Sequence, residues 1–368
     1  MYEASRQPIG HDGRRIAGRS RLAVSVLAAV TAVPAVATAA TISGAGAHPE
    51  RVRTTRIEPS TTGAGITAET DPARFHLVVE PRNRRDRRLV VMLPGSNAGA
   101  GNYSDFTTHA AGLGFAAISL SYPNRGTIGA ACQATQAEER CFERARGEIV
   151  FGADVPDPTG VRYSSDKVDV DAANSISGRL IALIDHLAAE DGSWNRFLIN
   201  DERSPYRAAH RGRVRLDHDK LILVGHSQGG GHAGFLATRT EVARVVMLSS
   251  PDDTNLSGTA PWIVGGSATP LDRYWGLRHE AEGPFGAHVA QVWCEFGGRG
   301  IGAGDTTSEV EVADGSGDPK GSHRLVLPGD LGTPLANHMA TAYDGAYLAG
   351  VPAAWTYLLG GEHRGGRP

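Results

Sequence analysis

The amino-acid sequence predicts an α/β fold in which a mostly parallel central sheet carries helices on both faces. Short apolar runs without polar alternation are typical of strands buried on both sides. Segments of helical length separate these runs, and glycine-rich turns follow directly after two of them. Because consecutive strands joined through a helix run in the same direction, this alternation indicates a parallel sheet covered by helices.

The predicted strands are short, and those inside the sheet are continuously apolar. Leu89–Leu93 (LVVML) and Leu221–Val224 (LILV) are the clearest examples. Both are too short for typical helices and rich in residues that favour strands. The predicted strands cover residues 74–80, 89–93, 115–120, 221–224, 245–248, 273–277 and 323–327.

Helices are predicted where a run of helical length separates two strands or where apolar residues recur at helical spacing. Ala172–Ala189 is the longest of them and has one apolar face. The stretch 125–171 is rich in glycine, proline and charge, and we expect it to form an excursion from the sheet, part of a cleft wall, and not a second domain. The predicted helices cover residues 103–113, 172–189, 229–240 and 353–359.

The composition describes a globular chain. Of its 368 residues, 40% are hydrophobic and 21% are charged, which excludes a broadly disordered or multi-spanning protein. The 47 glycines and 20 prolines follow no Gly-x-y period, which excludes collagen. A net charge of −3 gives no reason to expect nucleic acid as a partner, because phosphate-binding surfaces carry a clear basic excess.

The N-terminus is predicted to be an export signal. Arginines at four positions between 14 and 21 precede Leu22–Ala40, which is mostly apolar, uncharged and followed closely by small residues suited to cleavage. The alternative is a retained membrane anchor, because this stretch could just cross a bilayer. Pro34 and the weak hydrophobicity of alanine favour cleavage. We therefore expect residues 1–47 to be a signal peptide and processed segment, and 48–368 to be a single secreted or cell-envelope domain without a stable membrane span.

Export determines how the cysteines are interpreted. An oxidising compartment favours a disulfide between Cys132 and Cys141, which enclose eight residues; two free thiols are the alternative. Cys294 stands among apolar and aromatic neighbours and is predicted to be buried as a small apolar residue. No CxxC pair or His/Cys cluster indicates zinc, and no metal site is predicted.

The sequence Gly225–Gly229 (GHSQG) carries the predicted nucleophile, Ser227. It matches G-x-S-x-G, follows a predicted buried strand at once and precedes a predicted helix. A serine on such a turn is exposed on strained backbone, and small residues two positions away on each side prevent collisions. The alternative is a glycine-rich turn with an incidental serine.

A reactive serine needs a histidine base, and His338 has the best position for one. It follows the last predicted strand by about ten residues and precedes the terminal helix. His323 is the rival, but it begins a strand and so lies at the wrong end of the sheet. His226, inside the turn, cannot easily direct its ring onto the serine, and His232 and His279 are predicted to be structural.

The carboxylate that would orient the base is harder to assign. Glu282 follows the predicted strand 273–277 within a loop, and it is our first choice. Asp252, after the strand 245–248, is the main alternative, and Glu280 is the third. Each could also be an ordinary solvated acid.

The oxyanion formed during acyl transfer needs two backbone N–H donors. The residue after the nucleophile, Gln228, supplies the first. The second is expected from the glycine-rich loop after strand 89–93, where the N–H of Ser96 is the best candidate. A plain glycine turn is the alternative for this loop.

At this point the chain resembles the α/β-hydrolase superfamily over residues 53–360, and it is most similar to a group of secreted bacterial serine hydrolases with a GHSQGG turn. The resemblance implies a central sheet of about eight strands, a Ser–acid–His triad and no cofactor. The superfamily most often uses aspartate as the acid, which leaves Asp252 open, and the HGGG loop of some lipases is missing. The motifs concerned are LPGSNAG (Leu93–Gly99), SYPN (Ser121–Asn124), Cys132 with Cys141, GHSQGGGHA (Gly225–Ala233) and Asn337-His338.

The leading functional hypothesis is a secreted serine hydrolase that cleaves a small-molecule or polymeric carboxylic ester through an acyl-enzyme. An amidase or peptidase on the same triad is the first alternative, because the same groups serve both reactions. A catalytically silent cell-surface binding module is the second. The sequence indicates neither the chain length of the substrate nor an oligomeric state.

Overall fold

The structure, a computed structural model, describes residues 52–82, 86–133, 140–255, 258–302, 309–312 and 317–361. All of them belong to one compact unit, Gly44–Pro368. The predicted signal peptide and processed segment, 1–47, lies outside the described residues, so export stays a prediction. Within the described ranges, no helix has both the length and the apolar character that crossing a bilayer requires.

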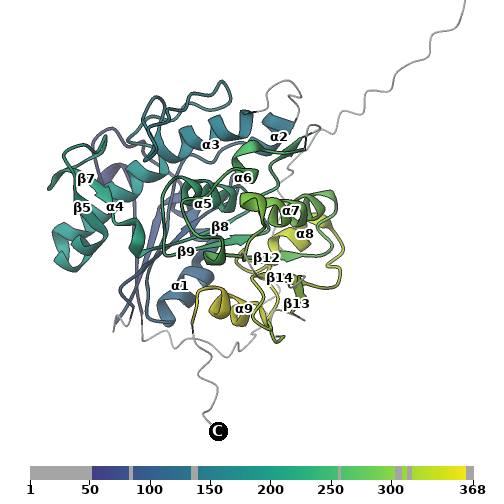
Figure 1. The fold of residues 1–368 in the computed structure, drawn as a ribbon. Helices are drawn as coiled ribbons and strands as arrows, with labels where there is room; N and C mark the ends of the chain where they lie inside the picture. Colours follow the sequence, from purple (N-terminus) through teal and green to yellow (C-terminus); the bar gives the residue numbers. More distant parts are fainter. Residues whose placement is uncertain are drawn as a thin grey trace, which may run out of the picture. The chain divides into compact units, whose positions relative to one another are not determined.

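The largest sheet in the described part of the chain has nine strands in the order β1-β2-β4-β3-β8-β9-β12-β14-β13 (Figure 1). Strand β2 is antiparallel to both of its neighbours, and all other neighbouring pairs are parallel. The predicted α/β class with a mostly parallel sheet is therefore confirmed. The strands are β1 (Val52–Ile57), β2 (His76–Pro81), β3 (Leu89–Leu93), β4 (Ala116–Ser119), β8 (Leu221–His226), β9 (Arg244–Leu248), β12 (Tyr274–His279), β13 (Val310–Glu311) and β14 (Arg324–Leu327).

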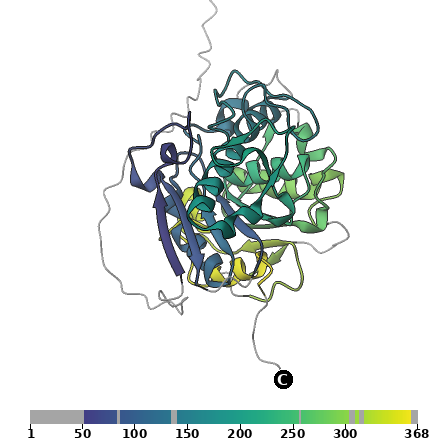
Figure 2. The same ribbon diagram turned by 90° about the vertical axis from the view of Figure 1, so that its left-hand side faces the viewer.

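Two of these strands had no counterpart in the sequence prediction, and both lie at an edge of the sheet. Strand β1 pairs only with β2, and its sequence VRTTRI lacks the continuous apolar run of a buried strand. Figure 2 shows it in purple at one edge. Strand β13 has two residues and is too short to leave a pattern. The expected count of about eight strands thus becomes nine.

Helices cover both faces of the sheet, and all four predicted ones are present. The predicted helix 172–189 begins later, at Ile176, because Ser175 caps it by accepting a hydrogen bond from the N–H of Gly178. Helix α7 was not predicted, although Pro284 at its start and its apolar spacing were visible signals. The helices are α1 (Ser104–Gly112), α2 (Ile128–Gln133), α3 (Cys141–Phe151), α4 (Ile176–Glu190), α5 (Gln228–Arg239), α6 (Pro261–Val264), α7 (Pro284–Glu295), α8 (Pro334–Met339) and α9 (Val351–Leu358).

Alternate residues of a central strand serve two separate hydrophobic clusters. Leu89, Val91 and Leu93 of β3 pack with residues of α3, α4 and α5, whereas Val90 and Met92 pack with residues of α1 and α9. Since side chains alternate along a strand, β3 contributes to both cores at once. This explains why its sequence is continuously apolar and why helices lie on both sides of the sheet.

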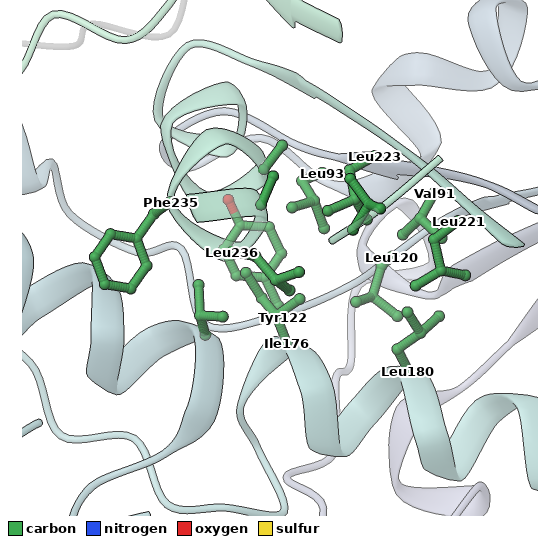
Figure 3. Packing of buried hydrophobic residues seen from close by; sticks show 14 of the residues in the cluster. Val91, Leu93, Leu120, Tyr122, Ile176, Leu180, Leu221, Leu223, Phe235 and Leu236 are labelled. Carbon is green, nitrogen blue, oxygen red and sulfur yellow. The ribbon is translucent and has the colours of Figure 1, made fainter. Parts of the chain in front are cut away.

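The larger cluster joins the strands that carry the site to their covering helices. Figure 3 shows Val91 and Leu223, from the neighbouring strands β3 and β8, packed near Leu180 of α4 and Leu236 of α5. Each of these side chains is almost fully buried. Burying a leucine or valine stabilises the fold by about 1.5–3 kcal/mol, so this packing holds the ends of the two strands in place.

The excursion 125–171 contains α2 and α3, and the predicted disulfide joins them. Cys132 near the end of α2 is bonded to Cys141 at the start of α3. The prediction for Cys294 is wrong, because this cysteine is exposed. Trp293 before it is buried, and one step along a helix turns the next side chain by about 100° towards solvent.

Candidate active site

The two glycine-rich loops of the sequence meet at the point where the strand order reverses. From β3 the chain crosses to β4 on one side, while β8 lies on the other side of β3. Crevices at the carboxyl ends of parallel strands form at such reversal points. Gly95, after β3, lies so close to the turn after β8 that a Cβ there would be 3.1 Å from the Cβ of Ser227. This distance is shorter than most Cβ contacts in proteins, so glycine suits this close approach.

Ser227 lies on the strained turn that its motif predicted. Its backbone has φ 54° and ψ −126°, a conformation that non-glycine residues rarely adopt, and it directly precedes α5. Its N–H donates to the carbonyl of Leu248 at 2.9 Å, which ties the turn to β9. A Cβ at Gly229 would overlap the carbonyl of Leu93, and one at Gly225 would overlap the backbone of Gly229. Strain held in place by such packing is typical of functional sites.

Glu282 and His338, the first choices for acid and base, lie side by side. Glu282 follows β12, and His338 lies in α8 after β14. Oε2 of Glu282 is 2.9 Å from Nδ1 of His338. Oε1 of Glu282 accepts hydrogen bonds from Oγ of Ser249 at 2.7 Å and from the N–H of His279 at 2.6 Å. A carboxylate that accepts from Nδ1 leaves Nε2 of the ring as its basic nitrogen.

His338, the predicted base, lies near the serine turn without bonding to the serine. The ring of His226, adjacent to Ser227, is 4.7 Å from the ring of His338 between centroids. Among the described residues, no hydrogen bond joins Oγ of Ser227 to the His338 ring. Catalytic hydrogen bonds of this kind often tighten only when the substrate binds.

The other acids and the rival histidine make no hydrogen bond to His338 among the described residues. Oδ2 of Asp252 accepts from Nε2 of Gln133 at 3.3 Å, and burial together with the neighbouring Asp253 raises the pKa of Asp252 to about 6. Asp252 is nevertheless close enough to His338 for the charge of His338 to lower this pKa slightly. Glu280 is exposed and accepts from the backbone N–H of a loop glycine. His323 precedes β14 at the opposite end of the sheet, where its ring stacks on an indole at 3.5 Å.

The two predicted oxyanion donors are linked to each other. Oε1 of Gln228 accepts from Oγ of Ser96 and from the N–H of Ile128, each at 3.0 Å. This bridge connects the loop after β3, the start of α5 and the start of α2. In the part of the chain that the structure describes, the backbone N–H groups of Ser96 and Gln228 have no acceptor. Gln228 is also the first residue of α5, where the helix dipole favours negative charge.

A buried ion pair that the sequence analysis missed supports this arrangement. Nε of Arg146, in α3, donates to Oδ2 of Asp253 at 2.6 Å, and both side chains are buried. Nη1 of Arg146 donates to the carbonyl of Gln228 at 3.0 Å, and the indole of Trp262 donates to Asp253 at 2.8 Å. The pair thus ties the excursion to the loop after β9 and to the nucleophile turn. An arginine and an aspartate 107 residues apart leave no sequence signal for such a pair.

A cavity of about 690 Å³ adjoins Gln228. Its wall includes residues of α2 and the segments 122–128 and 167–171, most of which lie between residues 125 and 171. Arg74 and Arg179, both buried, also line it, and among the described residues their hydrogen bonds go to neutral oxygens. Among the described residues, no group of three or more His, Cys, Asp or Glu side chains is arranged to hold a metal ion.

No curated protein matches the chain in sequence. Two solved structures of esterase B from Lactobacillus rhamnosis are similar, one inhibited by a C6-C4 SN3 compound and one by a C4-C4 SN3 tributyrin phosphonate. The first has 15% identity and a TM-score of 0.27, and it covers 56% of this chain and 51% of that one. The second has 13% identity and a TM-score of 0.34, with coverages of 67% and 71%.

The chain thus spans about half the length of the first of these esterases, and similarity at such low TM-scores carries no weight in the assignment. The sequence comparison with families is more informative. Residues 187–261, which include β8, the serine turn and α5, match a family described as an α/β hydrolase of unknown function (DUF1057). This match, the order of the sheet and the strained turn at Ser227 together support an assignment to the α/β-hydrolase superfamily.

Proposed function

We propose that this protein is a secreted serine hydrolase that cleaves carboxylic esters through an acyl-enzyme. One observation carries the proposal. A strained serine turn after β8 and a Glu282–His338 pair from the ends of β12 and β14 occupy the same edge of the sheet. Nucleophile, base and orienting acid are the groups that acyl transfer to serine requires.

In the first half of the reaction, Oγ of Ser227 attacks the carbonyl carbon of the ester while Nε2 of His338 takes the hydroxyl proton. Glu282 accepts the Nδ1–H of His338 and stabilises the resulting imidazolium. The carbonyl oxygen becomes negative and binds the N–H groups of Ser96 and Gln228. The C–O bond then breaks, His338 returns the proton to the leaving alcohol, and the acyl group stays on Ser227.

In the second half, a water molecule attacks the acyl carbon and gives its proton to Nε2 of His338. The second oxyanion collapses, and the serine oxygen leaves with the proton from His338. The carboxylic acid product departs. The cavity beside Gln228 gives a substrate group space next to the predicted oxyanion donors.

A fluorophosphonate probe tests the nucleophile, because it reacts only with an activated serine. We expect the wild-type protein and the Ser193→Ala control, altered in a turn after α4, to be labelled to the same extent. Ser227→Ala should not be labelled. Hydrolysis of p-nitrophenyl esters of graded chain length, measured beside the matched anilides, then separates esterase from amidase. An unlabelled wild-type protein would support the binding module instead.

Export is proposed on the sequence of residues 1–47, and the Cys132–Cys141 disulfide is compatible with an oxidising compartment. The full-length chain, expressed in a bacterial host, should appear outside the cytoplasm without its N-terminal segment. Intact-mass measurement would locate the cleavage site. Recovery of the uncleaved chain in the membrane fraction would instead favour the retained anchor.

A further inference from the structure

Three hydrogen bonds form a continuous line across the edge of the sheet at the candidate site. The N–H of Gly95 lies 3.0 Å from Oη of Tyr103, which lies 2.9 Å from Nδ1 of His226. Nε2 of His226 lies 3.0 Å from the carbonyl oxygen of His338. The line therefore connects the loop after β3, the segment before α1, the nucleophile turn and α8.

The hydrogen-bond acceptors in this chain of contacts determine which atom carries the hydrogen in each bond. A carbonyl oxygen only accepts, so Nε2 of His226 carries a hydrogen and donates it to His338. With the ring neutral, Nδ1 is an acceptor, so the hydroxyl of Tyr103 donates to it. The tyrosine oxygen in turn accepts from the N–H of Gly95. One arrangement of hydrogens satisfies all of these groups.

Burial keeps both side chains in the neutral forms that this arrangement needs. His226 is 1% exposed, and burial lowers its pKa to about 3, with the nearby His338 as a smaller cause. Tyr103 is fully buried, and burial raises its pKa well above the ordinary value. Hence His226 is not an alternative base at neutral pH. Its uncharged ring also adds no positive charge beside His338.

The line ends on a backbone group that has no partner within its own helix. His338 is the next-to-last residue of the six-residue helix α8, and the last carbonyls of a helix lack internal donors. The side chains of Ser249 and Thr341 approach the His338 carbonyl only to 3.4 Å, farther than the 3.0 Å of His226. Among the described residues, His226 therefore makes the shortest side-chain contact with this carbonyl.

We propose that His226 and Tyr103 are positioning residues, which set the backbone of the base and of the oxyanion loop relative to the nucleophile. His226 is the residue before Ser227, and Gly95 is the residue before Ser96, so each contact acts one residue away from a reacting group. This inference rests on the proposed function. Both side chains are buried, and both act through backbone that they hold.

Substitutions at these positions should change turnover more than substrate binding or stability. His226→Phe removes both hydrogen bonds of the ring and should lower kcat about 10- to 100-fold, as expected for a misplaced base. KM should change less than about threefold. His226→Gln keeps a donor for the His338 carbonyl and should recover activity to within about fivefold of wild type. Combining His226→Phe with Tyr103→Phe should add little, because both interrupt the same line.

The control removes a buried tyrosine hydroxyl at the other end of the sheet. Tyr274→Phe, at the start of β12, loses a hydroxyl contact to Ser267 at 2.7 Å and should leave kcat unchanged. If Tyr274→Phe lowers kcat as much as Tyr103→Phe at equal loss of thermal stability, the proposal is wrong. It is also wrong if folded His226→Phe keeps kcat within twofold of wild type.

A spectroscopic measurement tests the hydrogen arrangement directly and does not require the phenylalanine variant to fold. In ¹⁵N-labelled protein, His226 should remain neutral and protonated on Nε2 from pH 7 to pH 5. Titration of His226 in this range would overturn the proposal. Failure of the proposed function would look different, because the fluorophosphonate probe would then not label the wild-type protein, whatever the state of His226.

Discussion

Oε2 of Glu282 lies 2.9 Å from Nδ1 of His338, although 56 residues separate them in the chain. Glu282 follows β12 and His338 follows β14, and these two strands are parallel neighbours. The carboxyl ends of parallel neighbours lie at the same edge of the sheet. Among the three acids that the sequence left open, only Glu282 contacts the predicted base among the described residues. Its contact selects it over Asp252 and Glu280 as the acid of the proposed triad.

The first prediction concerns this choice of acid. Glu282→Gln should lower kcat by about 10³–10⁴-fold, because an amide does not stabilise the imidazolium and can favour the wrong tautomer. Asp252→Asn should lower it by less than about tenfold. Steady-state kinetics on one p-nitrophenyl ester measures both. A larger loss in Asp252→Asn than in Glu282→Gln would reassign the acid to the loop after β9.

The second prediction concerns the packing of the serine turn. Gly229→Ala forces a Cβ into the carbonyl of Leu93 and should lower the free energy of unfolding by about 3 kcal/mol or more. Gly266→Ala is the matched control, because no atom lies within 4 Å of the Cβ it adds. Urea unfolding compares the two. Equal stabilities would mean that β3 and α5 do not approach as closely as described.

The third prediction concerns the buried pair of Arg146 and Asp253. Arg146→Met leaves the carboxylate of Asp253 buried without its cation and should cost about 3–5 kcal/mol of unfolding free energy. Replacing both residues, as Arg146→Met with Asp253→Leu, should cost less than the sum of the single changes. A double-mutant cycle by urea unfolding measures the coupling. If the changes in unfolding free energy of the two single variants added up to that of the double variant, a direct interaction between Arg146 and Asp253 would be contradicted.

The fourth prediction concerns the disulfide. Replacing Cys132 and Cys141 together by serine should lower the free energy of unfolding by at most about 2.5–3 kcal/mol, since the closed loop is short. Thermal unfolding with and without reductant should reproduce the difference in the wild-type protein. Cys294→Ser serves as control and should have little effect, because that side chain is exposed. No stability change in the double variant would argue against the bond.

The fifth prediction concerns pH. Burial lowers the pKa of His76 and of His226 to about 3, and lowers that of His232 well below 6.5. Between these values and 6.5 the unfolded chain binds protons that the folded chain does not, so stability falls as pH decreases below 6.5. Each such histidine contributes about 1.4 kcal/mol per pH unit. Asp252 and Asp344 act in the opposite direction, because burial raises the pKa of each to about 6.

Urea unfolding between pH 7 and pH 4.5 tests the balance of these groups. The folded state should lose free energy over this range, because the buried histidines outnumber the acids with raised pKa. The slope of the unfolding free energy against pH should become shallower in a His76→Gln variant. This variant lacks one of the histidines that bind a proton in the unfolded chain but not in the folded one. A flat or rising stability towards pH 4.5 would show that these histidines are not buried as neutral groups.

Several features could be predicted from the sequence because they depend on local patterns. Continuous apolar runs identified β3, β8 and β9 to within two residues, since strands buried on both faces need apolar residues at every position. The G-x-S-x-G pattern after such a run predicted the strained turn at Ser227, because only glycine fits beside it. Elements with little burial or few residues, β1 and β13, left no such pattern.

The tertiary structure decided which distant side chains meet. The sequence ranked Glu282 first but could not separate it from Asp252, because both follow the carboxyl ends of predicted parallel strands. It dismissed His226 as a base and offered no role for Tyr103 or Arg146. Tyr103 contacts His226, 123 residues away, and Arg146 contacts Gln228, 82 residues away. Contacts of this kind depend on the order of the strands in the sheet and on how far each strand extends, relative to its neighbours, before its loop begins. Residue spacing encodes neither the strand order nor the extent of each strand. Local patterns, by contrast, do predict which strands are buried and where the backbone is strained.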